Sequence, residues 1–254
     1  MCISSENNDR YEQCVLGEEF HIFDVDDIFL DISKSYFSAE LQDTDFLLHN
    51  IGSNSGFTGS LILSLDEAPT RTKRSTIEIM SEFKQENGID YRFAKELSIE
   101  YFDKRHYCSP YMTKSSLWAP LEGESKGNVD FVNVSLLNSV KPYYSNETIL
   151  SVINRAEIVL PRGYSSASER LERYLENYVV FSYAMFLLNN EEGVFTPFSK
   201  WRGNCWKKYE YLIQKVQSSL SKKRMIDLKM ESDIRNEKSE SRVGELLNIH
   251  YNHN

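Results

Sequence analysis

The stretch EEFHIFDVDDIFLD, residues 18–31, decides the fold that the sequence predicts. Its first part, residues 18–24, is a short apolar run that ends in acidic residues, the pattern of a buried strand. Asp24 and Asp26 then follow, separated by one residue. Because ligands of open α/β sheets bind beyond the carboxyl ends of the strands, we expect this pair of carboxylates to belong to a functional site.

Strand and helix patterns alternate along the chain that follows. Short apolar runs predict three further buried strands, at 61–65, 129–137 and 157–161. Helical patterns separate them, at 32–49 (a helix, or a helix and a loop), 67–88, 90–103 and 146–156. This alternation predicts an α/β protein with a Rossmann-like parallel sheet flanked by helices.

The last third of the sequence predicts a helical C-terminal extension. Residues 165–190 and 198–222 carry apolar faces, and Gly193 and Pro197 between them predict an antiparallel turn. We therefore expect one folded domain over residues 18–222, preceded by a loose lead-in at 1–17. Residues 223–254 are charged and are expected to form a flexible or helical tail that extends away from the domain and is open to a protein partner.

Composition excludes several classes of protein. The 254 residues include 29 Lys and Arg against 38 Asp and Glu, a net charge of −9, which argues against non-specific nucleic-acid binding. The N-terminus lacks the apolar region of a signal peptide, and no apolar run of about 18 residues predicts a membrane span. The expected location is cytoplasmic, or a host cell reached by secretion without a classical signal peptide.

Two carboxylates at a strand end suit phosphoryl chemistry. One can attack phosphorus as a nucleophile, and the other can donate and accept a proton. A divalent cation would offset the negative charge of the carboxylates and of a substrate phosphate.

The segment IFDVDDIFLD resembles motif I of the haloacid dehalogenase superfamily, an apolar run followed by Asp-x-Asp-x-Thr/Val-Leu. Both aspartates and the apolar flanks match, and Ile28 stands where the family has Thr or Val. The resemblance implies that Asp24 is the nucleophile, that Asp26 is the general acid and base, and that both hold Mg²⁺.

The other motifs of that family can be sought in order. Ser64, at the end of the 61–65 strand, resembles the phosphate-binding hydroxyl of motif II, and Lys114 resembles the lysine of motif III, with Lys104 and Lys126 as competitors. Motif IV should end in acidic magnesium ligands, but Asn133 and Val134 occupy their place. Asp130 comes three residues too early, so the resemblance implies Asn133 as a weaker, uncharged third ligand.

These residues lead to two hypotheses. The first is a magnesium-dependent phosphohydrolase that forms an aspartyl-phosphate on a phosphorylated small molecule or phosphoprotein. The second is a catalytically silent fold of the same kind, acting as a binding module or as a secreted bacterial effector. It follows from Ile28 in motif I and from Asn133 in motif IV.

Overall fold

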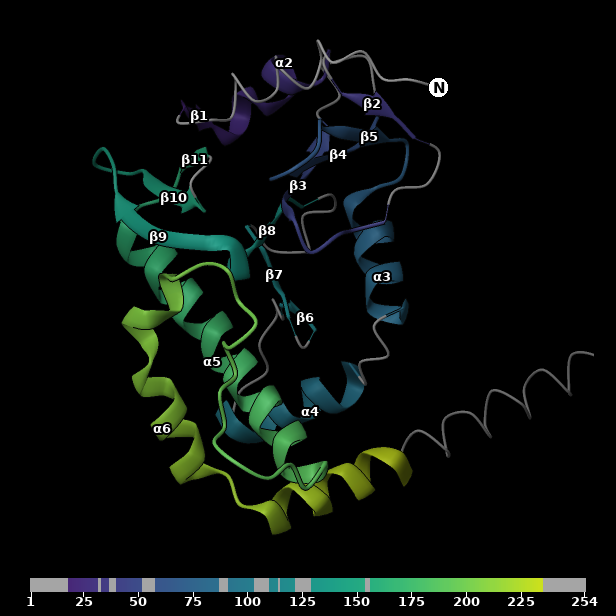
Figure 1. Cartoon of the computed structure of the whole chain (residues 1–254), viewed down its shortest axis with the longest axis vertical. Helices are drawn as coiled ribbons and strands as arrows, with labels where there is room; N and C mark the ends of the chain where they lie inside the picture. Colours follow the sequence, from purple (N-terminus) through teal and green to yellow (C-terminus); the bar gives the residue numbers. More distant parts are fainter. Residues whose placement is uncertain are drawn as a thin grey trace, which may run out of the picture.

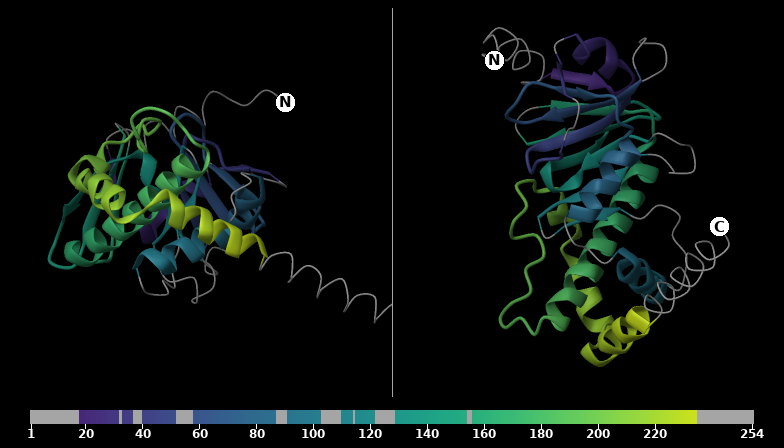
Figure 2. Two further views of the ribbon diagram at one scale, coloured as in Figure 1. Left: turned by 90° about the horizontal axis from the view of Figure 1, so that it is seen from below. Right: turned by 90° about the vertical axis from the view of Figure 1, so that its right-hand side faces the viewer.

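The computed structural model of the chain describes residues 18–31, 33–36, 40–51, 58–86, 91–102, 110–113, 115–121, 129–153 and 156–234. The predicted lead-in at 1–17 and the end of the predicted tail, 235–254, lie outside these residues. Two sheets form one end of the molecule and helices form the other (Figures 1 and 2). Of the described helices, none is long and apolar enough to cross a membrane.

Short strands dominate the first 160 residues, and longer helices follow. The strands are β1 (Glu18–His21), β2 (Lys34–Ser35), β3 (Asp45–Ile51), β4 (Gly59–Ser64), β5 (Thr70–Thr72), β6 (Tyr111–Met112), β7 (Leu117–Pro120), β8 (Phe131–Asn133), β9 (Leu137–Pro142), β10 (Thr148–Val152) and β11 (Ala156–Leu160). The α-helices are α2 (Val25–Phe29), α3 (Thr76–Glu86), α4 (Tyr91–Phe102), α5 (Tyr164–Leu188), α6 (Tyr211–Ser219) and a helix over 222–234. The 3-10 helices of the described residues are η1 (Ile22–Asp24), η4 (Val134–Leu136) and η5 (Cys205–Tyr209).

The predicted Rossmann-like parallel sheet is wrong. The strands form a seven-stranded sheet of order β2-β5-β4-β3-β8-β7-β6 and a four-stranded sheet of order β1-β11-β10-β9. Among the described strand pairs, β1 with β11 and β2 with β5 are parallel, and the other pairs are antiparallel. The protein is therefore a mixed α/β fold built on two largely antiparallel sheets.

Two predicted crossover helices are strands in the structure, which explains the error. The 146–156 segment forms β10, joined to β9 by a tight turn in which Tyr143 N donates to Glu147 O at 3.1 Å. The 32–49 segment contains β2 and most of β3. Short apolar runs do not distinguish strands from buried helical turns. Without these two helices, two of the three crossover connections that the predicted parallel sheet needs are missing.

Strand β3 separates two cores. Leu47 and Ile51 face a large core shared by both sheets and the C-terminal helices, whereas Leu48 faces a smaller core. Helix α3 contributes Ile79 and Met80 to the smaller core and so covers the outer face of the seven-stranded sheet. Burial on both faces follows from the alternation of side chains along a strand.

The C-terminal helices pack as one body with the sheets. The long helix predicted at 165–190 is confirmed as α5, and the helix predicted at 198–222 is shorter, since it begins as η5 and continues as α6. The expectation that the chain leaves the domain after residue 222 is wrong for 222–234, because Met225 is 0% exposed and Leu228 is 4% exposed. Truncation at residue 222 would remove both side chains from the core.

Gly203 lets the segment before η5 lie directly against the start of β9. Its backbone N donates to Ser135 O at 2.8 Å, and a Cβ at this position would lie 2.2 Å from Leu137 O. The obstructing atoms belong to the backbone of a paired strand, so they cannot rotate away. Only glycine fits this approach.

We therefore expect Gly203→Ala to lower the free energy of unfolding by about 3 kcal/mol, because the added methyl forces two backbone segments apart. Gly163→Ala is the matched control. Its Cβ would have Asn146 Oδ1 at 3.8 Å as the nearest atom, so the change should stay within about 1 kcal/mol, the scale of a helix N-cap substitution. Urea denaturation, monitored by circular dichroism, measures the free energy of unfolding of both variants. Equal effects of the two substitutions would contradict the argument that Gly203 is needed for the close approach of the two backbone segments.

Candidate functional site

Three ionisable side chains from separate elements meet at one point of the large core. His49 Nε2 lies 3.4 Å from Asp26 Oδ1, and His49 Nδ1 lies 3.1 Å from Asp130 Oδ1. The imidazole thus stands between two carboxylates and faces one with each of its nitrogens. We call this group the Asp26–His49–Asp130 cluster.

Local packing places each member of the cluster. Helix α2 is anchored by Phe29, which is fully buried and packs edge-on against Phe20 with ring centroids 5.3 Å apart, and this orients Asp26 on the same helix. Strand β3 carries His49. Asp130 directly precedes β8, whose antiparallel pairing with β3 brings it beside His49, and its Oδ1 also accepts from Asn50 N at 2.7 Å.

The cluster holds a charged imidazole. Burial on its own lowers the pKa of His49, but the carboxylates of Asp130 and Asp26 outweigh it and raise the pKa to about 9. His49 is therefore an imidazolium at neutral pH, and the cluster carries one positive and two negative charges. Both contacts engage Oδ1 of the aspartates, so neither of them uses Asp130 Oδ2.

A polar pocket of about 170 Å³ opens beside the cluster. It lies at the carboxyl ends of the parallel strands β1 and β11, where the chain continues into Ile22 and Phe23 on one side and into Pro161 and Arg162 on the other. Asp130 and Asn50 form its polar wall together with Arg162. Phe23 at this pocket is 73% exposed.

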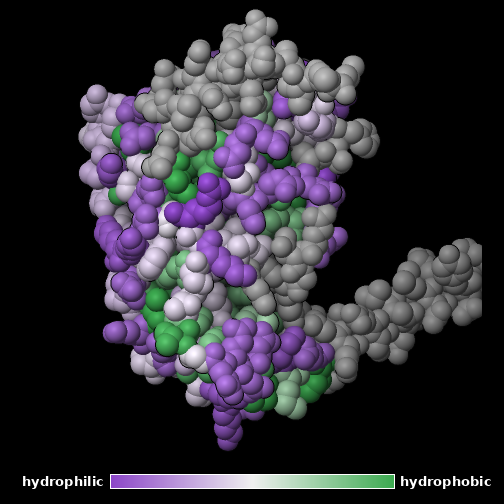
Figure 3. Space-filling model, viewed as in Figure 1, coloured by the Kyte–Doolittle hydropathy of each residue, from purple (hydrophilic) through white to green (hydrophobic). Residues whose placement is uncertain are grey.

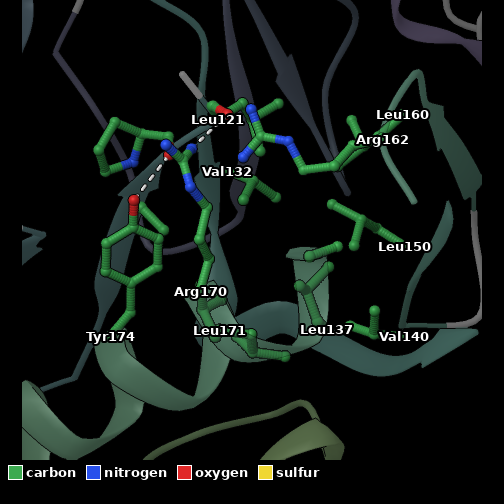
Figure 4. A pocket seen from close by; sticks show the side chains of 14 residues that line it. Leu121, Val132, Leu137, Val140, Leu150, Leu160, Arg162, Arg170, Leu171 and Tyr174 are labelled. Atoms are coloured by element: carbon green, nitrogen blue, oxygen red, sulfur yellow. Dashed lines mark hydrogen bonds between the residues drawn. The ribbon is translucent and has the colours of Figure 1, made fainter. Parts of the chain in front are cut away.

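An apolar recess of about 50 Å³ adjoins the polar pocket, and the two share Leu121, Leu160 and Arg162 as lining residues. Arg170 Nη1 donates to Leu121 O at 2.9 Å, which fixes the Arg170 side chain at the rim. Figure 4 shows the side chains of Arg162 and Arg170 at the same edge of the recess, with Leu137 and other aliphatic side chains beneath them.

Asp24 and Asp26, the predicted catalytic pair, have different environments. Asp24 ends η1 and is exposed, and it makes no side-chain cap to α2. Asp26 is half-buried and faces His49. The two carboxylates therefore do not share one polar environment, although both lie close in sequence to the pocket residue Phe23.

Ser64 and Asn133 lie around Asp45, at the opposite end of β3 from His49. Ser64 pairs with Asp45 across β3 and β4, and its Oγ lies 3.1 Å from Thr44 Oγ1. Asn133 Nδ2 donates to Asp45 O at 3.0 Å. Burial is the main cause that raises the pKa of the Asp45 carboxyl to about 6, and the adjacent Glu67 raises it further, against the hydrogen bonds from Gln42 and Ser64. Lys114, the predicted phosphate-binding lysine, and its competitors Lys104 and Lys126 lie outside the described residues.

The predicted magnesium ligands do not fit the ion as a set. Asn133 is fully buried, and its Oδ1 accepts from Ser135 N at 3.2 Å and from Ser135 Oγ at 2.6 Å. With both ends of its amide engaged by the protein, Asn133 cannot join the exposed Asp24 around one cation. Among the described residues, no group of three or more His, Cys, Asp or Glu side chains has the arrangement of a metal site.

Sequence reasoning missed His49, Arg162 and Arg170. His49 carries no motif, and it meets Asp130, 81 positions further along the chain, only because β3 and β8 pair. Asp130 was noticed, but as a misplaced metal ligand. The position of the pocket had a sequence signal, because it lies where the first predicted strand ends.

Comparisons of the chain with protein families, with curated proteins and with solved structures find no match.

The charge on His49 predicts a pH-dependent stability. The folded-state pKa of about 9 lies above the 6.5 of an unperturbed histidine, so the stabilisation is complete below pH 6.5 and is lost as the pH rises through 9. We expect the free energy of unfolding to fall by up to about 3 kcal/mol between pH 6.5 and pH 9.5, measured by urea denaturation. His49→Gln should remove most of this slope, and an equal slope in both proteins would contradict the charged cluster.

The separation of Asp24 from Asn133 also predicts the result of a phosphatase assay. Because Asn133 is engaged and Asp24 is exposed, we expect magnesium to stimulate no hydrolysis of p-nitrophenyl phosphate, and Asp24→Ala to match the wild type. Magnesium with beryllium fluoride should leave the unfolding temperature unchanged. Magnesium-dependent turnover that Asp24→Ala abolishes would instead support the aspartyl-phosphate mechanism.

Proposed function

We propose that the chain is a binding module for a small molecule that carries both an anionic and a cationic group, and that the polar pocket beside Asp130 is its site. The second hypothesis from the sequence also gave the chain a binding role without catalysis, but on a parallel fold that is wrong. The observation that carries it is the presence of Asp130 and Arg162, two opposite charges, in the wall of one pocket.

The charge arrangement favours such a ligand. Asp130 Oδ1 is held by Asn50 N and faces His49, so the carboxylate is oriented, while Oδ2 is outside those contacts. An oriented carboxylate is a good acceptor for an ammonium group. The planar guanidinium of Arg162 suits a carboxylate or phosphate, and the apolar side chains of Ile22, Leu121 and Leu160 strengthen both contacts by keeping water away.

The cluster acts here as a support. The His49 imidazolium offsets part of the charge that Asp26 and Asp130 bring into the core, and Asp26 fixes the far side of the ring. His49 and Asp26 thereby hold the Asp130 carboxylate in its position in the pocket wall, as supporting residues do in designed sites. This role needs no nucleophile and no metal.

Titration of the ¹⁵N-labelled protein with glycine tests the proposal. Glycine carries both charges and no side chain, so we expect saturable shifts in the amide signals of Asn50, Asp130 and Arg162, with acetate and methylamine at least tenfold weaker. Arg162→Gln and Asp130→Asn should each abolish the glycine shifts.

Arg173→Gln is the matched control, because Arg173 is exposed on α5 and does not line the pocket. Circular dichroism should show that Arg162→Gln, Asp130→Asn and Arg173→Gln all fold. If Arg162→Gln does not fold, Arg162→Lys replaces it in the test. Glycine shifts that survive both pocket substitutions, or that never saturate, would contradict the proposal.

A further inference from the structure

The recess next to the polar pocket extends the binding site, and this inference rests on the proposed function. The recess is lined by aliphatic side chains of both sheets, among them Val132, Leu137, Leu150 and Leu160, and by Ala167 in the first turn of α5. Because Leu121, Leu160 and Arg162 line both hollows, a ligand held at Arg162 can reach both.

The two arginines fix where an anion would lie. Arg170 is held by its hydrogen bond to Leu121 O at 2.9 Å, and Tyr174, one turn further along α5, donates to Pro120 O at 3.1 Å. Both donors therefore attach α5 to the end of β7. Arg162 and Arg170 both line the recess, and Figure 4 draws them at the same edge of it. Paired guanidinium groups bind the planar carboxylate well because several N–H donors can share its two oxygens.

The size of the recess limits the apolar part of the ligand. A water-sized group needs roughly 10–15 Å³ of such volume, so the 50 Å³ of this recess holds about three to five groups of that size. The side chain of leucine has four carbon atoms, whereas that of phenylalanine has seven. The recess therefore suits a short aliphatic chain and excludes an aromatic ring.

We infer that the ligand is a free α-amino acid with an aliphatic side chain of the size of leucine. Its carboxylate contacts Arg162 and Arg170, its ammonium group contacts Asp130, and its side chain fills the recess. Three groups on one carbon match three neighbouring features: an arginine pair, a carboxylate and an apolar hollow. A fatty acid has no ammonium group to contact Asp130, and an alkylamine has no carboxylate to contact the arginines.

Isothermal titration calorimetry with defined probes tests the inference. We expect L-leucine to bind about tenfold to a hundredfold more tightly than glycine, the range that burial of an aliphatic side chain provides. Removal of one charge, as in 4-methylpentanoate or 3-methylbutylamine, should weaken binding at least tenfold. L-phenylalanine should bind no better than glycine.

Two substitutions probe the recess itself. Ala167→Leu fills it and should reduce the affinity for leucine to the level of the affinity for glycine. Ser166→Leu, exposed on the same turn of α5, is the matched control and should bind leucine as the wild type does. Leu150→Ala enlarges the recess and should shift the preference toward phenylalanine, which keeps the test decisive if Ala167→Leu does not fold.

The outcomes separate this inference from the proposed function. The inference is overturned if leucine and glycine bind with equal affinity and neither Ala167→Leu nor Leu150→Ala changes leucine binding. The proposed function still stands in that case, provided that glycine binding depends on Arg162. Absence of binding for both amino acids overturns both.

Discussion

Strand β3 is the element on which the rest of the structure depends. It pairs with β4 on one side and with β8 on the other, and its two faces belong to two different cores. A strand enclosed in this way can carry a polar side chain only where another element supplies a partner. His49 finds two carboxylates near one end of β3, and Asp45 finds Ser64 at the other.

The Asp26–His49–Asp130 cluster ties helix α2 to the seven-stranded sheet. Asp26 belongs to α2, which comes soon after β1 of the four-stranded sheet. Asp130 directly precedes β8 of the seven-stranded sheet. Loss of one partner from a buried group of charges leaves another without compensation, at a cost of about 3–5 kcal/mol. The cluster therefore selects one relative position of α2 and the larger sheet, and that position also forms one side of the polar pocket.

The sequence predicts the parts of this fold that depend on local pattern. Four of the strands, β1, β4, β8 and β11, and the long helix α5 overlap predicted segments, because a run of apolar residues or a broad helical face is sufficient evidence for each. Strand direction is different. It depends on connections such as the Tyr143–Glu147 turn, after which the segment 146–156, predicted as a helix, forms strand β10 of a hairpin. The candidate site shows the same division: the end of β1 was a visible signal, whereas His49 and Asp130 meet only through the pairing of distant strands, and Arg162 and Arg170 carry no motif.

Helix α5 connects the two ends of the molecule. Its first turns line the recess through Ala167, Arg170 and Tyr174, and its later turns hold α4 through the buried contact of Ser98 Oγ with Asn177 Oδ1 at 2.7 Å. Glu176 in the same region also binds Lys215 of α6 at 2.6 Å. A helix of 25 residues is about 37 Å long, so it acts as a lever: a tilt of about 5° at its first turn displaces its far end by about 3 Å. The recess and the contacts with α4 and α6 therefore lie on one continuous helix, so a displacement of one end of α5 would also change the packing at the other end.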